Sequence, residues 1–312
     1  LSYAILSPLT ISADGATQSV YLQMSGSIIQ YSTDNQVTWN NITFTNWPVT
    51  FINSNPSPGS SNVLRVVATQ ALTISDIYGN TSGYFIAGSS YVTFDGSSNT
   101  INMNTITSYP GFIQNGTLGA NGYANVVVQN FTTAISGSTL ATNAGWVCQS
   151  YFGKGVLGNQ ITGCTNTGTL NASYAGGIAG AYAGSSGGLL NITKCSNTGI
   201  ASSPYTGGIA GYRFGYNTSN TCAITSCYSN GNISGSNAGG IVGADVGYND
   251  NASYTPVVNI ANCYSLGTIA TTCGGICGGT DGGVYTNTPS ITITNCYSSG
   301  TIVDASSGIV SV

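Results

Sequence analysis

Short apolar segments, several with alternating polar and apolar residues, run through the whole chain. Residues 63–67, 91–94 and 126–128 are examples, and many such segments are bounded by Gly, Asn, Asp or Ser. This pattern is typical of β-strands separated by turns. Glu is absent and there are only 4 Lys and Arg, so the charged face of an amphipathic helix cannot be built. We therefore predict an all-β fold.

One phrase recurs five times in the C-terminal half: a Cys, followed four positions later by a Gly. The Cys residues are separated by 31, 32, 36 and 33 positions, and a Gly-Gly-Ile sequence follows each of the first four at a similar distance. The phrase begins at Cys164, Cys195, Cys227, Cys263 and Cys296. A period of this length indicates a solenoid of stacked units. Each unit has too few large apolar residues to fold alone, so its core must come from its neighbours.

Each regular unit is interpreted as one coil containing three short strands. In the last unit, strands are predicted over 293–296, 301–303 and 308–310, with a turn over 297–300 between the first two. The Ile of each Gly-Gly-Ile sequence is expected to point inward and stack on its equivalents. The residues that vary in number follow the third strand and belong on the outside. Parallel strands wound in this way predict a right-handed parallel β-helix.

The chain is divided into three parts by the regularity of its pattern. Residues 1–58 combine short strands with turn pairs and end in a Pro-rich stretch, which predicts a small N-terminal β cap or domain. Residues 59–158 carry strands at irregular spacing and are interpreted as irregular coils. The range 159–312 is interpreted as the regular repeat β-helix, one phrase to a coil.

The regular units resemble the GLUG-type repeats of surface β-helix proteins, found in bacterial adhesins and in proteins of large DNA viruses. The resemblance is carried by residues 227–233 (CYSNGNI) and 238–243 (AGGIVG), and it extends over about 159–312. It implies a β-helix architecture and a cell-surface or virion setting. It implies no catalytic residues, because the residues that define the repeat are packing and turn residues.

The charge content limits the partners of this chain. Only 4% of the residues are charged, and four scattered cations cannot neutralise a nucleic-acid backbone. No apolar run is long enough to span a membrane, and the chain begins at Leu1 without a recognisable leader. We expect neither a nucleic-acid partner nor a membrane span, and an extracellular, cell-surface or virion-surface location.

The nine Cys residues are an odd number, so at least one thiol has no partner within the chain. Five of them occupy one repeat position and are expected to form a ladder with about 4.8 Å between neighbours. Stacked side chains point alongside one another, which would strain a disulfide. We predict reduced thiols that pack as small apolar residues. Cys273 and Cys277 lack the spacing of a zinc site and His is absent, so no metal or cofactor is expected.

An enzymatic β-helix would need paired carboxylates, or a basic residue beside a bound cation. The supply is eight Asp, two Lys and two Arg. Turn sequences surround Asp14, Asp34 and Asp95, whose side chains are expected to accept hydrogen bonds from their own backbone. The repeat register makes Arg213 and Asp245 stacked neighbours, expected to form a surface ion pair. A catalytic or ligand-binding pair, with Asp250 or Asp281 nearby, is the alternative. We expect no catalytic residues.

Two further sets of residues are candidates for contact with glycans. Tyr228, Tyr264 and Tyr297 follow the repeat Cys in three consecutive coils and predict a stack of rings, which either packs structurally or offers a weak platform for sugars. Asn-x-Ser/Thr sequences are candidate glycosylation sites. They begin at Asn41, Asn80, Asn115, Asn130, Asn171, Asn191, Asn217, Asn232 and Asn251.

The sequence predicts a non-enzymatic structural protein: a surface or virion fibre, or a protein that decorates a particle. Because no cap is recognised before Val312, the coil ends are expected to associate with further copies, giving a homo-oligomer or filament. A carbohydrate-binding adhesin and a polysaccharide-degrading β-helix enzyme are the alternatives.

Overall fold

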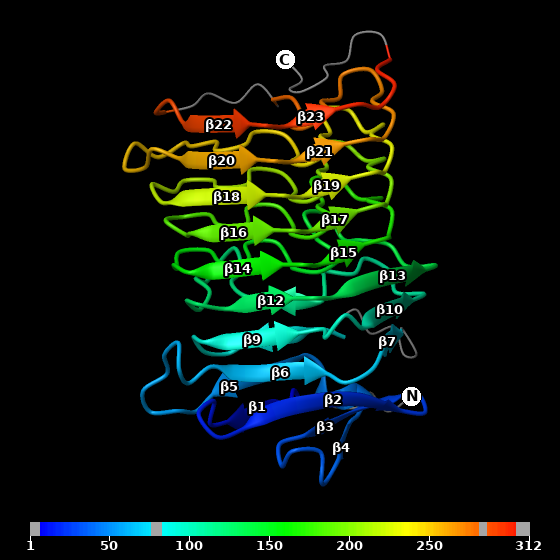
Figure 1. The fold of residues 1–312 in the computed structure, drawn as a ribbon, viewed down its shortest axis with the longest axis vertical. Helices are drawn as coiled ribbons and strands as arrows, with labels where there is room; N and C mark the ends of the chain where they lie inside the picture. The colour runs from blue at the N-terminus through cyan, green and yellow to red at the C-terminus, as the bar shows by residue number, and fades with distance from the viewer. Residues whose placement is uncertain (1–6, 76–82, 281–285, 304–312) are drawn as a thin grey trace.

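The chain winds into a right-handed parallel β-helix, seen in a computed structural model that describes residues 7–75, 83–280 and 286–303. In Figure 1 the strands nearest the viewer run from left to right while the chain climbs from the N-terminus at the bottom to the C-terminus at the top, which is the right-handed sense. The predicted fold class is confirmed. The predicted strand 308–310 lies outside the described residues.

Three sheets form the faces of the solenoid. The first is 4-stranded, in the order β1 (Thr10–Ala13), β5 (Val49–Asn53), β8 (Phe85–Ala87) and β11 (Ile113–Gln114). The second is 8-stranded, in the order β23 (Tyr297–Ser298), β21 (Tyr264–Ser265), β19 (Tyr228–Ser229), β17 (Ser196–Asn197), β15 (Thr165–Asn166), β13 (Thr132–Ser136), β10 (Thr100–Asn104) and β7 (Leu72–Ser75).

The third sheet is 11-stranded and contains the longest continuous ladder. Its order is β22 (Ser290–Thr294), β20 (Val257–Ala261), β18 (Thr221–Thr225), β16 (Leu190–Thr193), β14 (Asn159–Thr162), β12 (Val127–Gln129), β9 (Val92–Asp95), β6 (Leu64–Ala68), β2 (Ser19–Ser25), β3 (Ile28–Ser32) and β4 (Asn40–Ile42). Its pairings are parallel, except that β2, β3 and β4 pair antiparallel. A short 3-10 helix, η1 (Phe44–Asn46), follows β4.

The N-terminal strands share sheets with the coils that follow. β1 pairs in parallel with β5, and β2 pairs in parallel with β6, so the backbone of the N-terminal part already follows the path of a coil. The antiparallel strands β3 and β4 extend the same sheet beyond β2 at the lower end of the molecule (Figure 1).

In the regular coils the first face continues as isolated bridges and not as full strands. One column joins Ile113, Cys148, Ala179, Ala210, Val242 and Cys277, and a second joins Gly145, Gly176, Gly207, Gly239 and Gly274. From the second unit of the Gly column onward, the Gly in the column is the first residue of the Gly-Gly-Ile sequence, and the residue after the Ile belongs to the other column. The amides of Ile178 and Ala179 both donate to the carbonyl of Ile209, at 3.0 and 2.9 Å. The backbone bends at the Ile because two successive amides converge on one carbonyl.

The predicted aliphatic ladder is present. Ile178, Ile209, Ile241 and Ile276 are each 0% exposed and belong to one continuous core. A second inward column lies on the 11-stranded sheet and contains Ile161, Ile192, Ile224 and Ile260. Each full burial of a side chain of this size contributes about 1.5–3 kcal/mol, and the contribution depends on the neighbouring coil being in place.

The predicted turn over 297–300 is wrong, because the chain turns two residues earlier than the sequence suggested. Asn295 has a φ of 52°, and Tyr297–Ser298 forms β23 on the next face. The same left-handed corner recurs in every regular coil, directly before the repeat Cys. Its residues are Gly163, Lys194, Ser226, Asn262 and Asn295, with φ between 52° and 63°.

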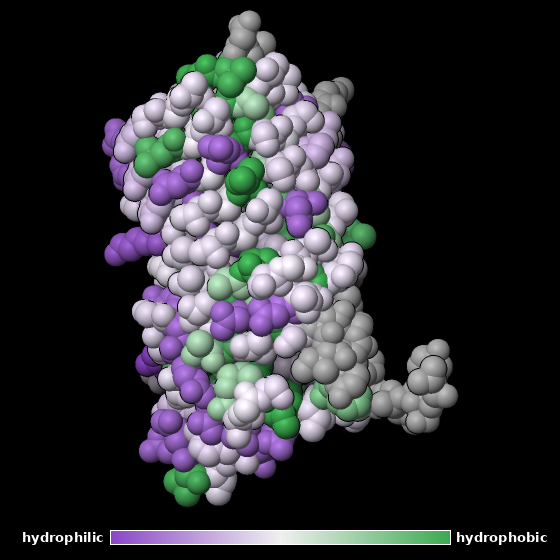
Figure 2. All heavy atoms as spheres, turned by 90° about the vertical axis from the view of Figure 1, so that its right-hand side faces the viewer, coloured by the Kyte–Doolittle hydropathy of each residue, from purple (hydrophilic) through white to green (hydrophobic). Residues whose placement is uncertain are grey.

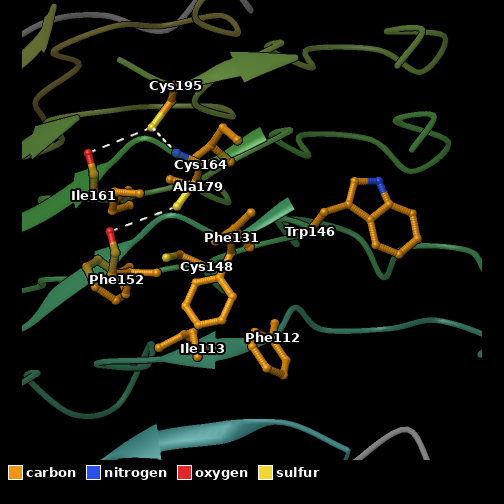
Figure 3. Close-up of a cluster of buried hydrophobic side chains, with 14 of the residues drawn as sticks. Phe112, Ile113, Phe131, Trp146, Cys148, Phe152, Ile161, Cys164, Ala179 and Cys195 are labelled. Carbon is orange, nitrogen blue, oxygen red and sulfur yellow. Dashed lines mark hydrogen bonds between the residues drawn. The ribbon is translucent and has the colours of Figure 1, made fainter. Parts of the chain in front are cut away.

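The repeat Cys residues form the expected ladder of free thiols. The Cys164 amide lies 3.4 Å from the sulfur of Cys195, and the Cys195 amide lies 3.3 Å from that of Cys227. Figure 3 shows Cys164 and Cys195 above Cys148, within the apolar core. Burial raises the pKa of the Cys222 thiol to about 12 and also raises that of Cys195. Thiols in this environment stay protonated and behave as small apolar groups.

The Gly that follows each repeat Cys is required by the close approach of successive coils. A Cβ on Gly231 would clash with the carbonyl oxygen of Gly199, and one on Gly267 would clash with that of Gly231. No left-handed φ is involved at these two positions. The coils therefore approach too closely here for any side chain.

The variant Gly231→Ala is expected to lower the free energy of unfolding by about 1–3 kcal/mol, because one methyl group must displace the adjoining coil. The matched control is Gly119→Ala, where a Cβ would meet nothing within 4 Å. Chemical denaturation of both variants measures the difference. Equal stability of the two would contradict the close packing of the Gly column.

Candidate functional site

The carboxylates of the described Asp residues that lie in turns are held by their own backbone, as predicted. Asp14 accepts from the Ala16 amide at 2.9 Å, Asp34 from the Thr38 amide at 2.9 Å, and Asp95 from the Ser97 amide at 2.9 Å. The Thr38 hydroxyl and amide together lower the pKa of Asp34 to about 2. These side chains stabilise turns and are not arranged as an acid and base pair.

Asp95 also connects three coils on the outer face of the 11-stranded sheet. Its carboxylate accepts from Arg65 on β6 at 2.9 Å and from Gln129 on β12 at 2.8 Å. The Arg65 side chain is 55% exposed, whereas that of Asp95 is 7% exposed. An ion pair with one solvated partner contributes little, about 0–1 kcal/mol.

Arg213 and Asp245 are stacked neighbours, as the repeat register predicted. The Arg213 amide donates to the Ala244 carbonyl at 3.0 Å, and the Arg213 Nε lies 3.3 Å from the Asp245 carboxylate. The expectation of a surface pair is wrong, since the side chains are 16% and 0% exposed. Aromatic rings exclude water from this pair: the guanidinium lies 3.8 Å from the ring centroid of Tyr248, and the Tyr212 hydroxyl donates to Asp245 at 3.0 Å.

Asp250 has hydrogen-bond partners of its own, on the loop beyond this pair. It accepts from the Tyr216 hydroxyl at 2.8 Å and from the Asn217 amide group at 2.8 Å, and these hydrogen bonds hold an exposed loop. The Asn217 hydrogen bond is the main cause that lowers the pKa of Asp250. Asp281, the other expected neighbour, lies outside the described residues.

Seven Tyr side chains are linked by ring contacts and form what we call the tyrosine cluster: Tyr151, Tyr174, Tyr182, Tyr205, Tyr212, Tyr216 and Tyr248. Three of them, Tyr212, Tyr216 and Tyr248, lie against the Arg213 guanidinium. Tyr151 stacks on Tyr182 at 4.8 Å between ring centroids, and Tyr174 stacks on Tyr205 at 5.0 Å. The ring of Tyr212 lies between them, 4.7 Å from Tyr174. The cluster brings together residues of four successive units.

Sequence reasoning missed this cluster, although the repeat register contains it. Tyr151 and Tyr182 occupy the position six places after the first Gly of their units, which is also the position of Arg213. Tyr174 and Tyr205 each stand two places before a Gly-Gly pair. Aligning every Tyr to the nearest Gly-Gly, and not only those beside the repeat Cys, would have revealed it.

The expected row of Tyr228, Tyr264 and Tyr297 is stacked on the outer face of the 8-stranded sheet. The ring centroids are 5.2 Å apart in both steps, and the rings are tilted by only 5° and 8° from parallel. Neighbouring rings cover each other's faces, so most of the row presents ring edges. Its use as a sugar platform remains a prediction.

The candidate glycosylation sites differ in accessibility. Asn115 is 1% exposed and donates to the Asn159 side chain, and Asn217 is 8% exposed and holds Asp250. A glycan does not fit the folded chain at these two positions. Asn130 and Asn191 are half-buried, whereas Asn41, Asn171, Asn232 and Asn251 are exposed. Asn80 lies outside the described residues.

A hollow of about 390 Å³ lies at the N-terminal end and is lined mainly by apolar residues, including Ile28, Ile42, Phe44 and Trp47. Among the described residues that line it, none has an ionisable side chain. Within the described ranges, no three His, Cys, Asp or Glu side chains gather as metal ligands. No described helix is long and apolar enough to cross a membrane.

Comparisons with known proteins found a distant structural similarity. No protein-family profile and no curated protein match the chain. One solved structure, from Bacteroides ovatus and described as a "putative immunoglobulin A1 protease", is similar at 17% sequence identity and a TM-score of 0.41, over 81% of this chain and 85% of that one. A likeness this remote carries no inference about activity.

Removal of the Arg213 side chain is expected to leave the buried Asp245 carboxylate without the charge that compensates it. The variant Arg213→Ala should lose about 3 kcal/mol of unfolding free energy, and Arg213→Ala combined with Asp245→Asn should lose less, because no charge is left buried. Arg65→Ala is the control and should lose about 0–1 kcal/mol. Thermal and urea unfolding measure these differences. A loss in Arg213→Ala no larger than in Arg65→Ala would show that the pair is not desolvated.

Proposed function

We propose that this chain is a non-enzymatic structural element, a stiff rod that acts as a surface fibre or decorates a particle. The observation that carries the proposal is that the described Asp and Arg side chains are engaged in hydrogen bonds and ion pairs within the fold. The five described Asp side chains all accept hydrogen bonds within the fold, and two of them pair with the two Arg. Residues committed to turns and ladders are poor proton donors or acceptors for a substrate.

The inter-coil contacts support a mechanical role. Polar side chains continue the ladders inside the rod: Asn166 donates to Asn197 at 2.7 Å, and Asn197 donates to Ser229 at 3.1 Å. These groups are 0–1% exposed. Buried hydrogen bonds that cross from coil to coil fix the register and resist shear.

The weakly charged outer surface supports the proposal of a protease-resistant structural protein in an extracellular or virion setting. Figure 2 shows that hydrophobic residues on the visible face form separate spots among pale and hydrophilic ones. With 4% charged residues and a net charge of −4, adjacent copies repel one another weakly. Association through the coil ends into a filament belongs to this proposal.

A degrading enzyme is the competing class, and it is tested directly. The purified chain is incubated with neutral and acidic polysaccharides, and new reducing ends and unsaturated products are measured. We expect no release above background. Release of oligosaccharide that is lost in Asp250→Asn or in Asp95→Asn, with folding retained, would overturn the proposal.

The mechanical part of the proposal is tested on the same sample by electron microscopy and proteinase K digestion. We expect straight particles, joined end to end at high concentration, whose regular coils survive digestion. Flexible particles and rapid cleavage between residues 159 and 280 would contradict a rod.

A further inference from the structure

We propose that the tyrosine cluster is a binding site for a neutral polysaccharide. The site lies on the corner beside the Gly-Gly-Ile face, away from the row of Tyr228, Tyr264 and Tyr297 on the 8-stranded sheet. It adds a binding activity to the rod and does not depend on the rod's structural role.

The first observation is the backbone conformation of the cluster. Four of its residues adopt left-handed φ: Tyr151 at 61°, Tyr174 at 66°, Tyr182 at 59° and Tyr205 at 61°. A bulky residue is rare in this region, which Gly or Asn occupies at lower cost. Asn143 and Asn237 hold the corner equivalent to Tyr174 and Tyr205 in neighbouring coils, with φ of 68° and 55°. Because Asn also occupies this corner, the turn itself does not require a Tyr ring.

The second observation is that the rings are held in place before any ligand arrives. The two stacked pairs are nearly parallel, within 3° and 9°, and Tyr212 is wedged between them with 4% exposure. The Arg213 guanidinium contacts the rings of Tyr212 and Tyr248 at 4.7 and 3.8 Å. Ordered aromatic side chains lose little entropy on binding.

The third observation is the charge of the surface, which selects the class of ligand. The Arg213 charge is compensated by Asp245, and the side chain is only 16% exposed. The Lys154 ammonium, 5.7 Å from the Tyr151 ring, donates to the Leu118 carbonyl at 2.6 Å, and the exposed Asp250 accepts from the Tyr216 hydroxyl and adds a negative charge. Among the described residues of the cluster, no excess of cations is available for phosphate, sulfate or uronate groups. A neutral ligand is therefore favoured.

The fourth observation is the shape and chemistry of the cluster. Tyr212 and Tyr248 are buried and the other five side chains are half-buried, so the cluster presents ring edges and hydroxyl groups and no large exposed apolar area. Sugar rings combine apolar C–H faces with hydroxyl rims, which match a Tyr ring and its hydroxyl. The stacked pairs follow the coil axis, so an extended chain of sugar units fits better than a compact molecule.

The test separates binding from folding by using the residues that the fold itself places at these corners. In the double variant Tyr174→Asn/Tyr205→Asn, both corners receive the residue found at Asn143 and Asn237, so the coil can still form. The ring contacts with Tyr212 are lost and the unfolding temperature should fall, so binding is measured at a temperature where circular dichroism shows both chains folded. Affinity gel electrophoresis with dextran, mannan, galactomannan and hydroxyethylcellulose, beside alginate and heparin, measures binding. The structural control is Tyr264→Ala on β21.

We expect at least one neutral polymer to retard the unaltered chain, and the double Asn variant to bind about tenfold or more weakly. Tyr174→Phe/Tyr205→Phe and Tyr264→Ala should retain binding. The proposal is overturned by retardation with alginate or heparin alone, by no retardation with any neutral polymer, or by equal binding of the folded Asn variant. These outcomes leave the structural role of the rod untouched, so the proposed binding site and the proposed structural function can fail independently.

Discussion

Main-chain hydrogen bonds that cross from one coil to the next are the interaction on which the structure depends. The amide of Gly207 donates to the carbonyl of Ala175 at 3.0 Å, and that of Gly239 donates to Thr206 at 2.8 Å, one repeat further along. Each such bond contributes about 0.5–1.5 kcal/mol, and none can form within a single unit. The coils must therefore keep a common path, whatever their side chains do on the outside.

This constraint explains which residues repeat. Inside the coil, Ile, Ala, Cys and Gly recur because a side chain must fit directly above its equivalent. At the corners, the backbone must enter the left-handed region at a fixed point, but the side chain there faces outward. The corner before the repeat Cys consequently accepts Gly163, Lys194 and Ser226 in successive coils. A functional surface can be built at such corners without disturbing the core, and the tyrosine cluster occupies two of them.

The sequence allowed the fold, the Ile and Cys ladders and the pairing of Arg213 with Asp245 to be predicted, because all of them follow from repeat register alone. The burial of that pair could not be predicted, since it results from rings that arrive from neighbouring coils. The corner at Asn295 was also missed, because left-handed φ is shared there by residues as different as Gly163 and Lys194. The accessibility of Asn115 and Asn217 likewise depends on loops of other coils.

The most direct measurement of the central claim is the stability of chains from which parts of a coil are removed. Deletion of 195–226, one whole repeat, joins Lys194 to Cys227 at equivalent corners and leaves every later residue in register. We predict cooperative unfolding and an unchanged β circular dichroism spectrum per residue for this variant. Deletion of only 195–210 removes half a coil and should abolish the fold. If the half-coil deletion folds as well as the whole-coil deletion, stacking in register is not what holds this protein together.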